Sequence, residues 1–221
     1  RFTTRTGVDI AADAAGPADG PAVLFLHGGG QTRHSWGNAV SVLADRGFRA
    51  ITMDLRGHGD SGWCPDANYE LHANAADLID VIGQLDDPTP TLVGASRGGI
   101  TSLLTVGESP SPVARALVLV DVVPKVEMEG AQEIIGFMAA RPDGFESLDE
   151  AAEVIAAYLP HRKRTRNLDG LRKNLRERDG RYFWNWDPRL LNSLGHGLSE
   201  DGKRDFLETA AGNITIPTLL T

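Results

Sequence analysis

The chain has 221 residues, of which 41% are hydrophobic and 24% are charged, and its formal net charge is −8. This composition is typical of a globular domain, and the acidic balance disfavours general nucleic-acid binding, which needs a basic surface. No apolar run is long enough to cross a bilayer as a helix, and the single cysteine, Cys64, has no partner for an intrachain disulfide. We therefore expect a cytoplasmic protein with no nucleic-acid partner and no membrane span.

Apolar strands alternate with helical stretches over the first half of the chain. A weak hairpin pattern surrounds Gly7. Apolar runs then predict strands at 22–26, 48–53, 91–94, 116–121 and 216–220. Helices are predicted between the strands at about 35–45, 70–86 and 97–107. Strands rich in Val, Leu and Ile without polar alternation are typical of parallel sheets that are covered on both faces. The pattern predicts an α/β fold with a mostly parallel, doubly wound sheet.

The alternation stops after the strand that ends near Asp121. The next 85 or so residues show only helical patterns, and we predict an all-α insertion between two strands of the sheet. Its helices are expected at 131–140, 149–159, 168–178 and 201–210. We accordingly divide the chain into a core (1–124), a helical cap (125–210) and a return to the core (211–221).

The strand at 91–94 leads into Gly94-Ala95-Ser96-Arg97-Gly98, and a predicted helix follows directly. Gly-x-Ser-x-Gly between a strand and a helix is typical of a nucleophile elbow, whose sharp turn presents the serine above the sheet. Gly94 and Gly98 remove Cβ atoms that would collide as the strand and helix close on each other. The motif predicts Ser96 as a catalytic nucleophile. The alternative is that Ser96 caps the helix and that the glycines belong to an ordinary loop.

A second glycine motif, His27-Gly28-Gly29-Gly30, follows the strand at 22–26. Acyl transfer needs backbone N–H groups aimed at the oxyanion of the tetrahedral intermediate. An HGGG-type loop supplies one donor, and the residue after the nucleophile supplies the other. We predict the amides of Gly29 and Arg97 as these donors. The alternative is that the motif is only a flexible loop.

A third motif, Gly57-His58-Gly59-Asp60-Ser61-Gly62, matches the dinucleotide-binding pattern G-x-G-x-x-G. That fingerprint must open directly into a helix whose N-terminus holds the pyrophosphate. Here a loop, residues 63–68, follows instead, so we disfavour nucleotide binding. The six histidines show no paired spacing typical of a metal site, and we expect neither a metal nor a cofactor.

Trp184 and Trp186 lie two residues apart in the predicted cap. They either pack in its core or line an apolar pocket beneath a lid, since ligand pockets are mostly apolar and aromatic.

Taken together, the HGGG loop, the segment 54–61 and the elbow resemble the α/β-hydrolase fold family, in residues and in order. The helical insertion is similar to the cap of its lid-bearing serine hydrolase branch, which includes esterases, lactonases, epoxide hydrolases and cofactor-free haloperoxidases. The resemblance implies that Ser96 is the nucleophile, that Gly29 and Arg97 hold the oxyanion, and that Gly28 and Trp36 face the substrate. Epoxide hydrolases and haloalkane dehalogenases of this family carry Asp at the elbow, so Ser96 argues against both activities.

The resemblance also implies a triad in the order Ser, acid, His. The acid is expected after the strand at 216–220 and the histidine later still, but the sequence stops at Thr221. His161 and His196 both fall in the predicted cap. Asp121, at a strand end, is an alternative acid, or it caps the connection into the cap. We expect that the sequence belongs to a longer chain.

These patterns favour a serine hydrolase that acts on a small, apolar carboxylic ester or lactone without a cofactor. Perhydrolase (haloperoxidase-type) or carbon–carbon bond hydrolysis stays open, because a fold does not fix a function. A non-catalytic ligand-binding member of the family stays open as well. The sequence indicates neither the substrate nor the oligomeric state.

Overall fold

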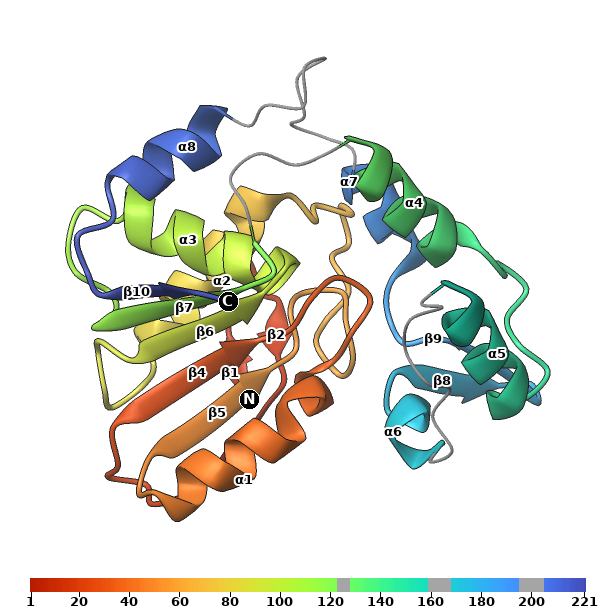
Figure 1. The fold of residues 1–221 in the computed structure, drawn as a ribbon, viewed down its shortest axis with the longest axis horizontal. Coiled ribbons are helices and arrows are strands. Elements are labelled where there is room, and N and C mark those ends of the chain that lie inside the picture. The colour runs from red at the N-terminus through yellow and green to blue at the C-terminus, as the bar shows by residue number, and fades with distance from the viewer. Residues whose placement is uncertain (123–127, 159–167, 195–204) are drawn as a thin grey trace.

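The computed structural model describes residues 1–122, 128–158, 168–194 and 205–221. A six-stranded sheet organises the molecule (Figure 1), and every neighbouring pair of strands is parallel except the last. This confirms the predicted α/β fold class. The strands lie in the order β10 (Thr218–Leu220), β7 (Ala116–Val120), β6 (Thr91–Ala95), β4 (Ala22–Leu26), β5 (Arg49–Met53) and β3 (Ala12–Ala15).

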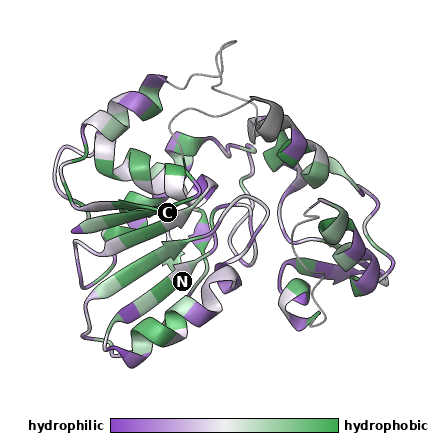
Figure 2. Cartoon of the chain, viewed as in Figure 1, coloured by the Kyte–Doolittle hydropathy of each residue, from purple (hydrophilic) through white to green (hydrophobic). Residues whose placement is uncertain are grey.

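The central strand β4 is buried along its whole length because helices cover both faces of the sheet. Side chains alternate between the two faces of a strand. Leu24 and Leu26 accordingly pack in the cluster on one face, and Val23 and Phe25 pack in the cluster on the other. Figure 2 shows these strands as the apolar centre of the core, with polar residues on the outer sides of the helices.

The two faces carry different helices, as Figure 1 shows. One face is covered by α2 (Leu71–Ile82), α3 (Arg97–Glu108) and α8 (Asp205–Gly212). The other is covered by α1 (Gly37–Asp45), which follows the 3-10 helix η1 (Arg33–Trp36). Helix α8 begins inside the range 125–210 that the sequence assigned to the cap and ends two residues beyond it, and it packs against α3 of the core through Leu207 and Ala210.

The first twenty residues contain the expected hairpin around Gly7. Strand β1 (Phe2–Thr3) pairs with β2 (Asp9–Ile10) in antiparallel register. Strand β3, which the sequence did not predict, then adds an antiparallel edge to the main sheet.

The inserted region between β7 and α8, called the cap below only as a name for its place in the chain, is not all-α, so that part of the prediction is wrong. It contains the expected helices α4 (Met128–Ala139) and α5 (Leu148–Tyr158), and then the short helix α6 (Asp169–Arg172). Residues predicted as helix up to 178 instead enter a hairpin of β8 (Leu175–Arg178) and β9 (Arg181–Trp184). The cause is Asp179-Gly180, whose φ angles of +52° and +73° fit a two-residue hairpin turn. The 3-10 helix η2 (Pro188–Leu190) and α7 (Leu191–Leu194) follow.

Parts of two predicted helices, residue 159 and residues 201–204, lie outside the described residues. Among the helices that the structure does describe, none combines the length and the apolar character needed to span a membrane.

The packing of α3 on α8 can be tested with a glycine substitution. Helix propensity alone favours Gly107→Ala by about 1 kcal/mol. A Cβ at Gly107, however, would lie 2.6 Å from the carbonyl carbon of Ala210, so α8 must shift. We expect a net loss of about 1–3 kcal/mol in unfolding free energy, measured by urea denaturation.

Gly136→Ala in α4 is the matched control, because nothing lies within 4 Å of a Cβ at that position. It is expected to raise stability by up to about 1 kcal/mol. Equal effects of the two substitutions would contradict the tight contact between α3 and α8.

Candidate active site

Ser96 lies on a sharp turn between β6 and α3. Its φ of 46° and ψ of −116° fall in a region that L-residues rarely adopt. Its backbone N–H donates to Val120 O of the neighbouring strand at 3.0 Å, which ties the turn to the carboxyl end of β7. The motif Gly-x-Ser-x-Gly thus has the backbone geometry that an elbow requires, with the half-buried Ser96 at the N-terminus of a helix.

Two glycines of the motif permit this turn. A Cβ at Gly98 would lie 2.5 Å from Leu26 O and 2.6 Å from His27 O, and one at Gly94 would lie 2.5 Å from Gly98 O. Real Cβ atoms essentially never approach backbone so closely. Only glycine therefore lets α3 begin against the ends of β6 and β4.

The same packing brings the HGGG loop next to Ser96. A Cβ at Gly28 would lie 3.5 Å from Ser96 Cβ. The Gly28 amide donates to Gln31 Oε1 at 3.0 Å, and the Gly30 amide donates to His58 Nε2 at 3.3 Å. Between them, the Gly29 amide makes no hydrogen bond to another described residue, and no atom lies within 4 Å of a Cβ built there. The Gly29 amide is therefore available to a ligand.

Arg97, the other predicted donor, is the first residue of α3, so its amide lies at the same helix N-terminus as Ser96. Its side chain is buried and donates from Nη2 to the Tyr69 carbonyl. The guanidinium thus serves the packing of the core, and the predicted catalytic role concerns only the backbone amide.

Asp121 follows β7, one strand away from the elbow. It has a positive φ of 54°, its side chain is exposed, and its amide donates to Thr221 O at 3.0 Å. Asp121 and Ser96 therefore both lie at the carboxyl end of the sheet, after the parallel neighbours β7 and β6. Its role as the triad acid stays a prediction.

The cap reaches the HGGG loop through Trp186 and Met138. A Cβ at Gly30 would lie 3.8 Å from the indole Nε1 of Trp186 and 3.4 Å from Met138 Cε. Both side chains are about 5% exposed or less. Sequence reasoning named Trp186 but missed Met138, because nothing in a helical pattern shows which core loop a methionine will meet.

Trp184 and Trp36 lie in other surroundings. Trp184 packs between Phe137 and Phe145, with ring centroids 5.7 Å and 5.1 Å away, and joins the core cluster to the cap cluster. Trp36 packs on Phe25 at 5.2 Å, in the cluster under α1. It also lines a surface hollow of about 410 Å³ with residues 34–39, which Ser96 does not line. Substrate contacts by either tryptophan stay predictions.

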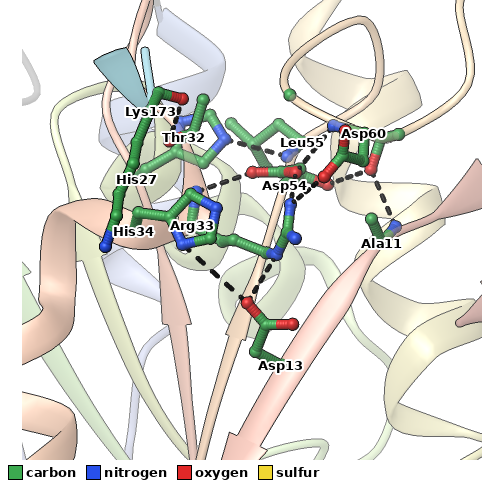
Figure 3. A network of polar contacts seen from close by, with 12 residues as sticks. Ala11, Asp13, His27, Thr32, Arg33, His34, Asp54, Leu55, Asp60 and Lys173 are labelled. Atoms are coloured by element: carbon green, nitrogen blue, oxygen red, sulfur yellow. Dashed lines mark hydrogen bonds and ion pairs between the residues drawn. The ribbon is translucent and has the colours of Figure 1, made fainter. Parts of the chain in front are cut away.

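A buried carboxylate holds the segment that follows the HGGG loop (Figure 3). Asp54, at the end of β5, is fully buried. It accepts hydrogen bonds from the Arg33 amide at 2.6 Å and the Asp60 amide at 2.9 Å, and forms an ion pair with Arg33 Nη1 at 2.5 Å. Arg33 also pairs with Asp13 at 2.7 Å and Asp60 at 2.8 Å. Every group of this network has a partner, which buried charges require.

This network accounts for the G-x-G-x-x-G match. A Cβ at Gly59 would lie 2.7 Å or less from both carboxylate oxygens of Asp54, and one at Gly57 would lie 3.0 Å from Tyr69 Cζ. The next helix, α2, begins only at Leu71. The glycines therefore serve close packing in a loop, and no helix opens from them to hold a pyrophosphate.

A second buried carboxylate ties the cap to this loop. The Asp187 amide donates to Gly57 O at 2.8 Å, and its carboxylate accepts from Tyr69 Oη and from Arg189. The Cys64 amide donates to the same Tyr69 oxygen at 2.9 Å. Burial raises the pKa of Asp187, but the hydrogen bonds from Arg189 and Tyr69 outweigh it, and the pKa lies below its usual value. We call Tyr69, Asp187 and Arg189 the cap anchor.

Across the ranges that the structure describes, no group of three or more His, Cys, Asp or Glu side chains is placed to hold a metal ion.

Comparisons with known proteins find similar sequences and similar folds. A sequence model described as the alpha/beta hydrolase fold matches residues 21–199. The Mycobacterium tuberculosis protein named Esterase Rv0045c is 34% identical over 187 residues, which cover 82% of this chain and 61% of that protein. Protein phosphatase methylesterase 1 of Bos taurus is 31% identical over 152 residues, which cover 67% of this chain and 40% of that protein. The chain thus spans less than two thirds of either relative.

Among solved structures, E-2-(acetamidomethylene)succinate hydrolase is similar to this fold with a TM-score of 0.83 and 25% identity. The likeness covers 100% of this chain and 78% of that one.

The strained turn at Ser96 predicts a stability difference between two substitutions. Ala keeps the unfavourable φ and ψ, whereas Gly adopts them at little cost. A residue in such a region costs about 1–3 kcal/mol, so Ser96→Gly should be more stable than Ser96→Ala by about 1 kcal/mol in urea denaturation. Equal stability of the two variants would show that the turn relaxes around Ala.

The cap anchor predicts a cost for removing one hydroxyl. Tyr69→Phe deprives the Asp187 carboxylate of a donor and the Cys64 amide of its acceptor, and all three residues are buried. We expect a loss of about 1–3 kcal/mol in unfolding free energy.

Tyr182→Phe is the control for this substitution, because Tyr182 is only half-buried and its hydrogen bonds with Phe145 run through the two backbones. It should change stability by about 0.5 kcal/mol or less. A Tyr69→Phe variant as stable as this control would refute the anchor.

Proposed function

Because the chain belongs to the α/β-hydrolase fold family, we propose that it is a serine hydrolase that cleaves a small carboxylic ester or lactone. The observation that carries the proposal is the position of Ser96, on a strained turn at a helix N-terminus and beside the HGGG loop. The names of two relatives, an esterase and a methylesterase, support an ester as the substrate class.

In this proposal the Ser96 hydroxyl attacks the acyl carbonyl, and the alcohol leaves to give an acyl-enzyme that water then hydrolyses. The amides of Gly29 and Arg97 stabilise the oxyanion of each tetrahedral intermediate. Loss of one such donor typically costs about 3 kcal/mol of transition-state stabilisation. Gly28 borders the same site in this proposal, since a Cβ built on it would lie 3.5 Å from Ser96 Cβ.

The base that takes the Ser96 proton is neither His27 nor His58. Both rings are buried, and both nitrogens of each ring contact backbone groups. His161 and His196 lie outside the described residues. Asp121 is a candidate acid in this proposal, and its place directly after β7, the strand that pairs with β6, supports it.

The cap side of the site is apolar. Met138 and Trp186 lie over Gly30, and an apolar wall favours an acyl group without charge. The other reactions of this fold, perhydrolysis and carbon–carbon bond hydrolysis, use the same nucleophile, and turnover of candidate substrates would separate them from ester hydrolysis.

A fluorophosphonate probe tests the nucleophile on the full-length protein. We expect one adduct by intact mass, located at Ser96 by peptide mapping, together with hydrolysis of short-chain p-nitrophenyl esters. Ser96→Ala should abolish both. Ser111→Ala, a change of an exposed serine after α3, should preserve both.

An adduct that persists in Ser96→Ala would refute the assignment of the nucleophile. Saturable binding of esters without an adduct or turnover would instead favour a non-catalytic ligand-binding member of the family.

A further inference from the structure

Two buried histidines join the HGGG loop to the loop that follows β5. His27, from the HGGG loop, contacts the Leu55 amide through Nε2 at 3.0 Å and Gly28 O through Nδ1 at 2.7 Å (Figure 3 shows the bond to Leu55). His58, from the other loop, contacts the Gly30 amide through Nε2 at 3.3 Å and Arg56 O through Nδ1 at 3.0 Å. Each ring thus bonds to a carbonyl of its own loop through Nδ1 and to an amide of the other loop through Nε2.

These partners fix the proton on each ring. A backbone N–H only donates, so Nε2 of both rings must accept and carry no proton. A carbonyl only accepts, so Nδ1 of both rings must carry the proton and donate. Both histidines are therefore neutral and have the same tautomer.

The surroundings of the rings favour the neutral form. Both side chains are fully buried, and their centroids are 4.9 Å apart in an edge-to-face arrangement. Burial lowers the pKa of His27, and Arg97 lowers it further, against the opposing effects of the Gly28 carbonyl and Asp54. Burial also lowers the pKa of His58, well below its usual value, with added lowering effects of His27 and Arg97 against the Arg56 carbonyl.

We propose that this histidine clasp, His27 and His58, positions the HGGG loop for catalysis, and that His58 is the positioning residue for the peptide next to Gly29. By holding the Gly30 amide, the neutral His58 ring fixes the peptide next to Gly29, whose own amide then points into the site. This inference rests on the proposed function, because it assigns the Gly29 amide to the oxyanion.

Protonation of a ring would break its hydrogen bond to the amide of the other loop. A proton on Nε2 of His58 would face the Gly30 N–H, donor against donor, near the Arg97 guanidinium and the second ring. A histidine with a lowered folded-state pKa takes up its proton more readily when unfolded. Stability from the clasp is therefore fully present above about pH 6.5 and is lost as the pH falls below that value.

Two substitutions of His58 test the role in the full-length protein. Gln places its amide oxygen near the position of Nε2 and cannot titrate, whereas Leu fills the space without an acceptor. We expect His58→Leu to lower kcat for a p-nitrophenyl ester about 10- to 100-fold, with KM within about threefold, since one donor contributes about 10²–10³. His58→Gln should recover most of that loss at pH 8.

His58→Gln should also make stability less dependent on pH below 6.5 than in the wild type. His72→Gln, at an exposed histidine outside the HGGG loop, is the control for turnover and should leave kcat unchanged. Wild-type kcat in a folded His58→Leu protein would overturn the positioning role. So would a loss in His58→Gln as large as that in His58→Leu.

The ring nitrogens supply a readout that does not depend on turnover. Two-bond ¹H–¹⁵N correlation spectra should show Nε2 of His27 and His58 unprotonated at pH 7, with neither ring titrating near pH 6.5. A proton on Nε2, or titration near 6.5, would overturn the clasp. A wild-type protein without a Ser96 adduct would refute the proposed function, whereas an adduct with full kcat in His58→Leu refutes only the positioning role.

Discussion

The contact between the start of α3 and the ends of β6 and β4 is the constraint on which the candidate site depends. At Gly94 and Gly98 the backbones come so close that a Cβ would lie 2.5 Å from a carbonyl oxygen. Packing of this kind fixes the helix against two strands at once, and it leaves Ser96 no relaxed conformation. The strain at Ser96 is supported by the packed core around it, because helices cover both faces of the central strand β4 and most residues of α3 are buried.

The loop after β5 connects three parts of the molecule. Its Asp54 holds Arg33 beyond the HGGG loop, its His58 holds Gly30, and its Gly57 carbonyl accepts from Asp187 of the cap. Buried polar networks specify one arrangement when every member is satisfied, and they are costly when one member is lost. The HGGG loop and the cap therefore share one polar support, the loop after β5. A change in the loop after β5 affects both sides of the site.

The local motifs could be read from the sequence because their geometry lies within a few residues. The elbow, the HGGG loop and the strands β4, β5, β6 and β7 were found at their observed places to within one or two residues. The cap hairpin was missed although its turn, Asp179-Gly180, is a local signal. Apolar spacing before the turn also fits a helix, and the prediction of a helix to residue 178 followed that spacing rather than the turn.

By itself, the sequence determined the fold class and the identity of Ser96, Gly29 and Arg97 as candidates, since strand–turn–helix patterns act over short range. Only the tertiary structure decided which distant groups meet them. His58 reaches Gly30 from 28 residues away, Met138 lies over the same glycine, and Trp36 packs under α1. Such contacts depend on how the strands are ordered in the sheet and how the helices cover it. Residue type and spacing along the chain do not encode them locally.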